Sequence, residues 1–275
     1  MPLPEPSTRA GKAGLAAVLA DPARALVAVD YDGTLAPIVE RPEDAVPAPG
    51  AVDALRALAG SVGAVAVVSG RAATDVVTLG DLSSVPGLWV LGHYGLQRWS
   101  GGRLETPAVD PAIDRARERL AAALETAPAG VHVEDKKHSL VVHTRPAAEP
   151  LAALDEVAPQ VAALAAELGL ELVPGRMVLE LRPAGTDKGR ALRALVAERD
   201  VRAVVYVGDD AGDLPAFAAV EALRSGGVAG VTAASVDPAL DDAPVELARR
   251  ADLVLAGPAD VVSFLFALAA AIGEP

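Results

Sequence analysis

The feature that most constrains the fold is a series of short apolar segments, rich in Val, Leu and Ala, that alternate with longer helical patterns. The segments cover residues 26–29, 64–68, 88–91, 203–207, 228–231 and 252–255. Their hydrophobicity is continuous rather than alternating, which is typical of strands buried on both faces. Strands that alternate with helices favour a doubly wound parallel sheet, a Rossmann-like α/β core. Ligands of such sheets bind beyond the carboxyl ends of the strands.

The middle of the chain has a different pattern. Residues 110–126 open with Asp-Pro and continue as a helix rich in Ala, Arg and Glu. Residues 130–145 alternate polar and apolar side chains, which predicts a half-exposed antiparallel strand or hairpin. A second helix is expected at about 150–168, and two further alternating strands around Pro174-Gly175.

These two patterns predict a division into domains. We expect a core formed by residues 1–104 and 184–275, interrupted by an inserted α+β cap domain at 105–183. The apolar run at 14–20 indicates an amphipathic first helix rather than a signal peptide. The run at 261–272 is about half the length needed to span a bilayer, which indicates a packed final helix.

Composition excludes several classes of function. The formal net charge of −13 opposes binding to nucleic acid and to anionic membranes, so an anionic substrate needs a local positive site. The chain has no cysteine, which excludes disulfides and thiol catalysis and fits a cytoplasmic location. With only four histidines, zinc ligands are scarce. The sequence does not determine the oligomeric state, and we expect a monomer.

Two carboxylates follow the first apolar segment in "LVAVDYDGTLAP". Asp30 and Asp32 are two positions apart, so on a strand they would face the same side and repel unless a cation or a shared proton intervenes. A turn that favours Asp and Gly is the structural alternative. A calcium loop of the EF-hand type is excluded because Arg41 stands where its twelfth-position Glu belongs.

A second acidic group ends another apolar segment in "AVVYVGDDAGD". A helix N-cap explains one of Asp209, Asp210 and Asp213, but not all three. Two acidic strand ends at one edge of a parallel sheet indicate an oxygen-ligated cation, most simply Mg²⁺. The sequence leaves open which of the three carboxylates bind the ion directly.

A hydroxyl and a lysine complete the set of candidate site residues. Ser69 follows the segment in "VAVVSGR", where it either caps a helix or, with helix-start N–H groups, binds an anion. Lys188 in "GTDKGRALRALV" is expected in the first turn of a helix capped by Thr186 or Asp187. A cation there opposes the helix dipole, which indicates either a solvated surface lysine or one placed to neutralise a phosphate.

With these motifs the sequence resembles the haloacid dehalogenase superfamily of phosphatases, through "DYDGT", "VVSG", "DKG" and "GDDAGD". The resemblance implies that Asp30 forms an aspartyl-phosphate and that Asp32 acts as general acid and then general base. It also implies that Mg²⁺ is held by Asp30, the backbone carbonyl of Asp32, Asp209 and Asp213, the last in a supporting role. Ser69 and Lys188 would hold the phosphate oxygens, with Gly70 and Arg71 beside the substrate.

The inserted domain indicates which family within this superfamily the sequence resembles. "VEDKKHSLVVHTR" and "LELRPAGTDKG" are similar to the cap signatures of trehalose-6-phosphate phosphatases, and imply that Lys136, His143, Arg145 and Glu180 face the sugar. Each of these residues also has a structural alternative, as a solvated strand residue, a cross-strand filler or, for Glu180, a partner of Arg182. The chain departs from the family at 92–97, where "GHYGLQ" replaces Gly-Asn-His-Gly followed by Glu.

The implied function is hydrolysis of trehalose 6-phosphate to trehalose and phosphate, the last step of trehalose biosynthesis. The departure at 92–97 keeps open a phosphatase for another sugar phosphate, such as a sucrose or glucosylglycerol ester. A phosphomutase on the same core would carry a smaller cap, and a phospho-accepting receiver domain would lack the insertion. A non-catalytic sugar-phosphate sensor is the remaining alternative, and the presence of both Asp30 and Asp32 argues against it.

Overall fold

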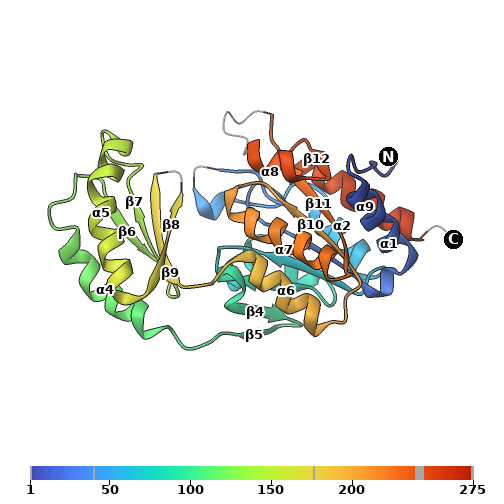
Figure 1. The fold of residues 1–275 in the computed structure, drawn as a ribbon, viewed down its shortest axis with the longest axis horizontal. Coiled ribbons are helices and arrows are strands. Elements are labelled where there is room, and N and C mark those ends of the chain that lie inside the picture. Colours follow the sequence, from blue (N-terminus) through green and yellow to red (C-terminus); the bar gives the residue numbers. More distant parts are fainter. Residues whose placement is uncertain (1, 40, 176, 239–244, 274–275) are drawn as a thin grey trace. The chain divides into compact units, whose positions relative to one another are not determined.

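The structure is a computed structural model, and it describes residues 2–39, 41–175, 177–238 and 245–273 (Figure 1). The chain divides into two compact units, one of residues 1–106 and 187–275, the other of residues 107–186. No helix within the described residues is both long enough and apolar enough to cross a membrane.

The first unit is built on a sheet of eight described strands in the order β12-β11-β10-β1-β2-β3-β4-β5. Every pair of neighbouring strands from β12 to β3 is parallel. Strand β4 is antiparallel to β3, and β5 is antiparallel to β4. The strands are β1 (Ala25–Val29), β2 (Ala64–Val68), β3 (Trp89–Gly92), β4 (Gln97–Ser100), β5 (Arg103–Glu105), β10 (Ala203–Gly208), β11 (Ala229–Ser235) and β12 (Leu253–Leu255). All six predicted core segments are confirmed as strands, whereas β4 and β5 were not predicted.

Helices cover both faces of this sheet, which explains the continuous apolar segments. Along β1, Val27 and Val29 pack into one cluster, and Leu26 and Ala28 into another on the opposite face. The first cluster includes residues of α1 (Arg9–Ala20), α2 (Ala51–Ala59), α3 (Ala73–Leu79) and α9 (Pro258–Gly273). The second includes residues of α6 (Lys188–Glu198), α7 (Leu214–Ser225) and α8 (Val245–Arg250), and Figure 1 shows α6 and α7 against the sheet. The predicted doubly wound fold is confirmed.

The parallel register brings several strand ends to one edge. Val29 at the end of β1 pairs with Val207 of β10 and with Val67 of β2. The backbone N–H of Asp30 continues this ladder by donating to the Val207 carbonyl over 2.8 Å. The residues that follow β1, β2 and β10 therefore emerge together, as expected for a parallel sheet.

The second unit is a four-stranded antiparallel sheet in the order β6-β7-β9-β8, within the described part of the chain. Its elements are α4 (Pro111–Ala123), β6 (His132–Asp135), β7 (Leu140–His143), α5 (Pro150–Leu168), β8 (Leu170–Gly175) and β9 (Val178–Pro183). Leu140 and Val142 of β7 and Leu179 and Leu181 of β9 pack against the helices, which leaves alternate residues on the other face.

Both helix predictions in this unit are confirmed, and α4 begins as expected, with Asp110 as N-cap and Pro111 as the first helical residue. The two strands predicted around Pro174-Gly175 are confirmed as β8 and β9. Strand β8 includes both of these residues, and Gly175 pairs with Val178.

Candidate active site

The loop after β1 places Asp30 at the edge of the sheet, where its side chain is buried. Gly33 follows with a φ of +71°, and a Cβ atom on it would lie 1.9 Å from Asp209 Oδ2. Only glycine therefore allows the loop to approach Asp209 so closely. Ser235 at the end of β11 fixes the loop from the other side, because its Oγ donates to the Gly33 carbonyl over 2.7 Å.

Lys188 is the first residue of α6, and the predicted helix start is confirmed by Asp187, whose side chain accepts from the Arg190 N–H over 2.7 Å. The lysine is not a solvated surface residue. Its Nζ is buried 2.9 Å from Asp30 Oδ1 and 2.8 Å from Asp213 Oδ1. Burial lowers the pKa of Lys188, but these two carboxylates outweigh it and hold the pKa well above the usual value.

Asp213 is fully buried and accepts four hydrogen bonds. Its Oδ1 accepts from Lys188 Nζ and, over 2.6 Å, from Tyr206 Oη, while its Oδ2 accepts from the backbone N–H of Asp209 (2.9 Å) and of Asp210 (3.2 Å). A carboxylate offers about four lone-pair sites. The arrangement therefore suits Asp213 for holding its neighbours in place more than for direct contact with an ion.

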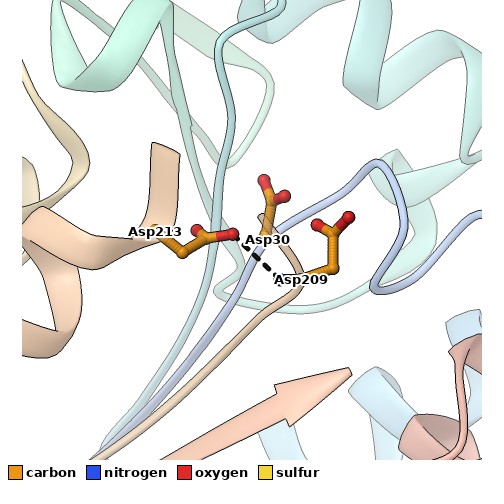
Figure 2. A group of neighbouring side chains, drawn as sticks. All are labelled: Asp30, Asp209 and Asp213. Carbon is orange, nitrogen blue, oxygen red and sulfur yellow. Dashed lines mark hydrogen bonds between the residues drawn. The ribbon is translucent and has the colours of Figure 1, made fainter. Parts of the chain in front are cut away.

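The carboxylates of Asp30, Asp209 and Asp213 form the one group of described residues whose oxygen atoms could hold a metal, all within 4.8 Å of one another. Figure 2 shows the Asp30 and Asp209 carboxylates pointing the same way, with Asp213 turned to the Asp209 backbone. Burial, reinforced by the neighbouring carboxylates, raises the pKa of Asp30 well above its usual value and that of Asp209 to about 8. Such a buried, oxygen-only and electron-rich group fits a hard divalent cation.

Asp210 is the helix cap that the sequence predicted for one of the three carboxylates. Its side chain caps the short 3₁₀ helix η5 (Ala211–Asp213) by accepting from the Gly212 N–H over 2.8 Å. A helix cap therefore explains Asp210, and the two remaining carboxylates of this motif lie beside Asp30.

Asp32 does not join this group of carboxylates. Its side chain makes a bidentate ion pair with Arg71, with 2.7 Å both from Nε to Oδ2 and from Nη2 to Oδ1. The repulsion expected between Asp30 and Asp32 is thus relieved by two separate cations, Lys188 for the first and Arg71 for the second. Arg71, which the resemblance placed beside the substrate, contacts Asp32.

Ser69 is buried at the end of β2 and does not cap α3, whose N-cap residue is Ala72. Its Oγ instead accepts from the Arg71 N–H over 3.1 Å. A Cβ atom on Gly70 would lie 2.8 Å from Tyr94 Oη, so glycine is required for Tyr94 to pack against this turn. The segment "GHYGLQ" therefore contacts the turn through the Tyr94 side chain, and the Tyr94 N–H donates to the Ser69 carbonyl over 2.9 Å.

The segment that departs from the family pattern has an unusual backbone. His93 and Tyr94 have φ values of +46° and +57°, a region that residues other than glycine rarely adopt. Gln97 is buried, and its Oε1 accepts from the Ala73 N–H over 2.9 Å at the start of α3. The amide oxygen thus accepts from one of the N–H groups that a helix N-terminus leaves without an intrahelical partner.

Comparison with known proteins decides the family. The family model described as Trehalose-phosphatase matches residues 28–242, which contain every motif described above. The chain belongs to the trehalose-phosphatase family.

A curated relative supports this membership, and two solved structures share the fold. The chain is 36% identical over 208 residues to a trehalose-phosphate phosphatase of Mycobacterium marinum, covering 72% of this chain and 52% of that protein. It shares the fold of the C-terminal domain of a Candida albicans trehalose-6-phosphate phosphatase (TM-score 0.76, 20% identity, 98% and 99% covered). It also shares the fold of a haloacid dehalogenase-like hydrolase from Bacteroides thetaiotaomicron (TM-score 0.64, 14% identity, 87% and 97% covered). The chain spans about half the length of the mycobacterial relative.

The second unit carries the other residues that the family resemblance singled out. On the sheet face that does not pack against its helices, His143 Nε2 lies 2.9 Å from Glu134 Oε2, and the His143 ring stacks on His132 with centroids 4.9 Å apart. This hydrogen bond to His143 is the main reason why the pKa of Glu134 is lowered. Lys136 Nζ lies 3.9 Å from the same carboxylate. Sequence reasoning missed His132 and Glu134, although they precede Lys136 by four and two residues, a spacing that places alternate strand residues on one face.

Glu180 lies on the same face, since it pairs with Val141, which in turn pairs with Glu134. It is buried and accepts from Ser139 Oγ over 2.7 Å. The alternative of a surface pair with Arg182 is wrong about the location, because both side chains are buried. Arg182 Nε lies 3.4 Å from Glu171 Oε2. Arg145 is exposed, two residues beyond the end of β7.

Proposed function

We propose that the chain is a Mg²⁺-dependent phosphatase that hydrolyses trehalose 6-phosphate to trehalose and phosphate, the last step of trehalose biosynthesis. The observation that carries the proposal is the buried contact of Lys188 with Asp30, set among carboxylates at the carboxyl edge of the sheet. A buried carboxylate nucleophile facing an anionic substrate needs such positive charge nearby. The family membership supports the substrate class.

In the proposed mechanism, an Asp30 oxygen forms a bond to phosphorus while the ester P–O bond breaks and its electron pair passes to the leaving oxygen. Asp32 gives that oxygen a proton, and the resulting carboxylate then takes a proton from the water that cleaves the aspartyl-phosphate. Ser69 and Lys188 would hold the phosphate oxygens in line. Ser69 directly follows β2 and Lys188 is the first residue of α6, so both lie at this edge of the sheet.

The residues fit a resident Mg²⁺ ion, which would neutralise phosphoryl charge when bound. Asp30, the backbone carbonyl of Asp32, and Asp209 would bind it. Asp213 would fix their positions through its hydrogen bonds to Lys188, Tyr206 and the backbone N–H of Asp209.

The second unit would act as the cap domain that selects the sugar. His143 and Glu180 come from the sheet face that does not pack against its helices, Lys136 directly follows β6, and Arg145 lies in the turn after β7. Charged donors and acceptors held on a sheet suit a hydroxyl-rich ligand. A phosphatase for another sugar phosphate is the second candidate, because Tyr94 and Gln97 stand where the family has His and Glu, and Tyr94 packs against Gly70. A cytoplasmic location and a monomeric state stay predictions.

The deciding experiment measures phosphate release from trehalose 6-phosphate with Mg²⁺, beside glucose 6-phosphate, sucrose 6-phosphate and p-nitrophenyl phosphate. Asp30→Asn is the control. We expect selective hydrolysis of the trehalose ester by the wild type and none by the control. Activity on other esters alone would favour the second candidate, and no activity on any ester would favour a sugar-phosphate sensor.

A further inference from the structure

Arg71 is held by three of its side-chain N–H groups. Besides the two hydrogen bonds to Asp32, its Nη1 donates to the Pro42 carbonyl over 2.7 Å. The guanidinium carbon also lies 5.8 Å from the centre of the Tyr31 ring, within cation–π range. The side chain therefore joins Asp32 to the loop that follows it in sequence.

The backbone of Arg71 is fixed as well. Its N–H donates to Ser69 Oγ over 3.1 Å, and its carbonyl accepts from the His93 N–H over 2.8 Å. The position of the guanidinium is thus set relative to Ser69, which the proposed function places on the phosphate. Through Arg71, the position of Asp32 is set relative to the same group.

This ion pair differs from the surface pairs of the chain. Arg119 and Glu167 make a similar bidentate contact, but their side chains are 48% and 60% exposed, and such pairs contribute little. The side chains of Arg71 and Asp32 are 19% and 33% exposed. Two parallel hydrogen bonds in a partly shielded place restrict the Asp32 carboxyl to one orientation.

We propose that Arg71 is a positioning residue for the general acid and base, holding Asp32 where it can reach the bridging oxygen of the substrate and the attacking water. The inference rests on the proposed function and goes beyond it, since Arg71 acts here through Asp32 and not on the sugar. A general acid works only within hydrogen-bond reach of the atom that it protonates. A misplacement of about 1 Å can cost about 100-fold in rate.

The test compares leaving groups in a single turnover. The sugar alkoxide needs the proton from Asp32, whereas p-nitrophenolate leaves without one. For Arg71→Gln we expect release of trehalose to fall about 10- to 100-fold with KM unchanged, while the first release of nitrophenol changes less than about threefold. Because the base role is also impaired, steady-state nitrophenol release should slow after a burst that the wild type lacks.

Two further variants separate positioning from a merely structural role. Arg71→Ala should regain part of its activity when guanidinium ion is added at a concentration that does not unfold the protein. Arg119→Gln, which removes a similar bidentate contact from the exposed pair with Glu167, should behave like the wild type. Circular dichroism and the melting temperature check that each variant is folded.

The outcomes distinguish this inference from the proposed function. A raised KM with unchanged kcat for both esters would show that Arg71 binds substrate directly, and equal losses for both esters without rescue would show a structural role. Either result, with an active wild type and an inactive Asp30→Asn, overturns the inference alone. A wild type that releases no phosphate overturns both.

Discussion

The Nζ atom of Lys188 lies 2.9 Å from Oδ1 of Asp30, with both side chains about 95% buried. The two residues are far apart in sequence, and the contact forms because α6 begins at the same edge where β1 ends. Since the same lysine also contacts Asp213, a single cation partly balances several buried carboxylates. This shortage of positive charge is the basis of the first two predictions.

Replacing Lys188 with Met should destabilise the protein and abolish most activity. Breaking a buried ion pair leaves an uncompensated charge, which costs about 3–5 kcal/mol, and losing one charge-stabilising group costs about 100-fold or more in kcat. Urea unfolding at pH 8 with a chelator, and phosphate release, measure the two effects. Lys12→Met is the control, because Lys12 pairs with Glu5 at the surface and should change stability by less than about 1 kcal/mol. Equal stability of the two variants would refute the prediction.

The metal-free protein should lose stability as the pH rises. The pKa of Asp209 is raised to about 8, mainly by burial, while an unfolded aspartate titrates near about 4. Between these values the folded state keeps a proton that the unfolded chain has released, so stability falls with increasing pH. With a chelator present, the melting temperature should therefore fall more for the wild type than for Asp209→Asn between about pH 5 and pH 8. Parallel curves would contradict this.

Adding Mg²⁺ should reverse that trend. Because the ion and the proton compete for the same carboxylate oxygens, the ion binds more tightly at pH 8 than at pH 6. The increase in melting temperature on adding Mg²⁺ should be larger at the higher pH and nearly absent in Asp209→Asn. A pH-independent increase, or one that Asp209→Asn retains in full, would show that Asp209 is not a ligand.

Removing the Tyr206 hydroxyl should cost more than removing that of Tyr31, although both side chains are fully buried. Tyr206 donates to the charged Asp213 over 2.6 Å, and Tyr31 to the neutral carbonyl of Ala45 over 2.8 Å. Hydrogen bonds to charged groups contribute about 1.5–3 kcal/mol and neutral ones about 0.5–1.5 kcal/mol. Urea unfolding of Tyr206→Phe and Tyr31→Phe measures the difference, and a larger loss for Tyr31→Phe would contradict the assignment.

Two glycines with similar backbone angles should respond differently to alanine. Gly33 and Gly87 have φ values of +71° and +67°, but no atom lies within 4 Å of a Cβ placed on Gly87, whereas Asp209 Oδ2 lies 1.9 Å from one on Gly33. Gly87→Ala should cost about 1–2 kcal/mol in stability and leave activity intact. Gly33→Ala should displace Asp209 as well and reduce phosphate release by about 100-fold. Retained activity in Gly33→Ala would show that the loop adapts.

The strand ends at the carboxyl edge of the sheet could be predicted because they depend on local pattern and on a general property of parallel sheets. The segments that end before Asp30, Ser69 and Asp209 are apolar on both faces, and parallel strands present their carboxyl ends together. The capping role of Asp210 was likewise among the local alternatives, since an N-cap is a matter of a few neighbouring residues. The antiparallel strands β4 and β5 lacked such a signal, because they are short and partly exposed.

The partners of the charged side chains were decided only by the tertiary structure. Tyr206 is one residue of an apolar strand, and nothing around it in sequence indicates that its hydroxyl meets Asp213. Arg71 and Asp32 are 39 positions apart and belong to different loops. Each apolar segment indicates a buried strand without reference to the rest of the chain. The sequence therefore determined which residues reach the edge of the sheet. Which of them touch depends on register, helix placement and close approach at glycines such as Gly33, and these are properties of the packed chain.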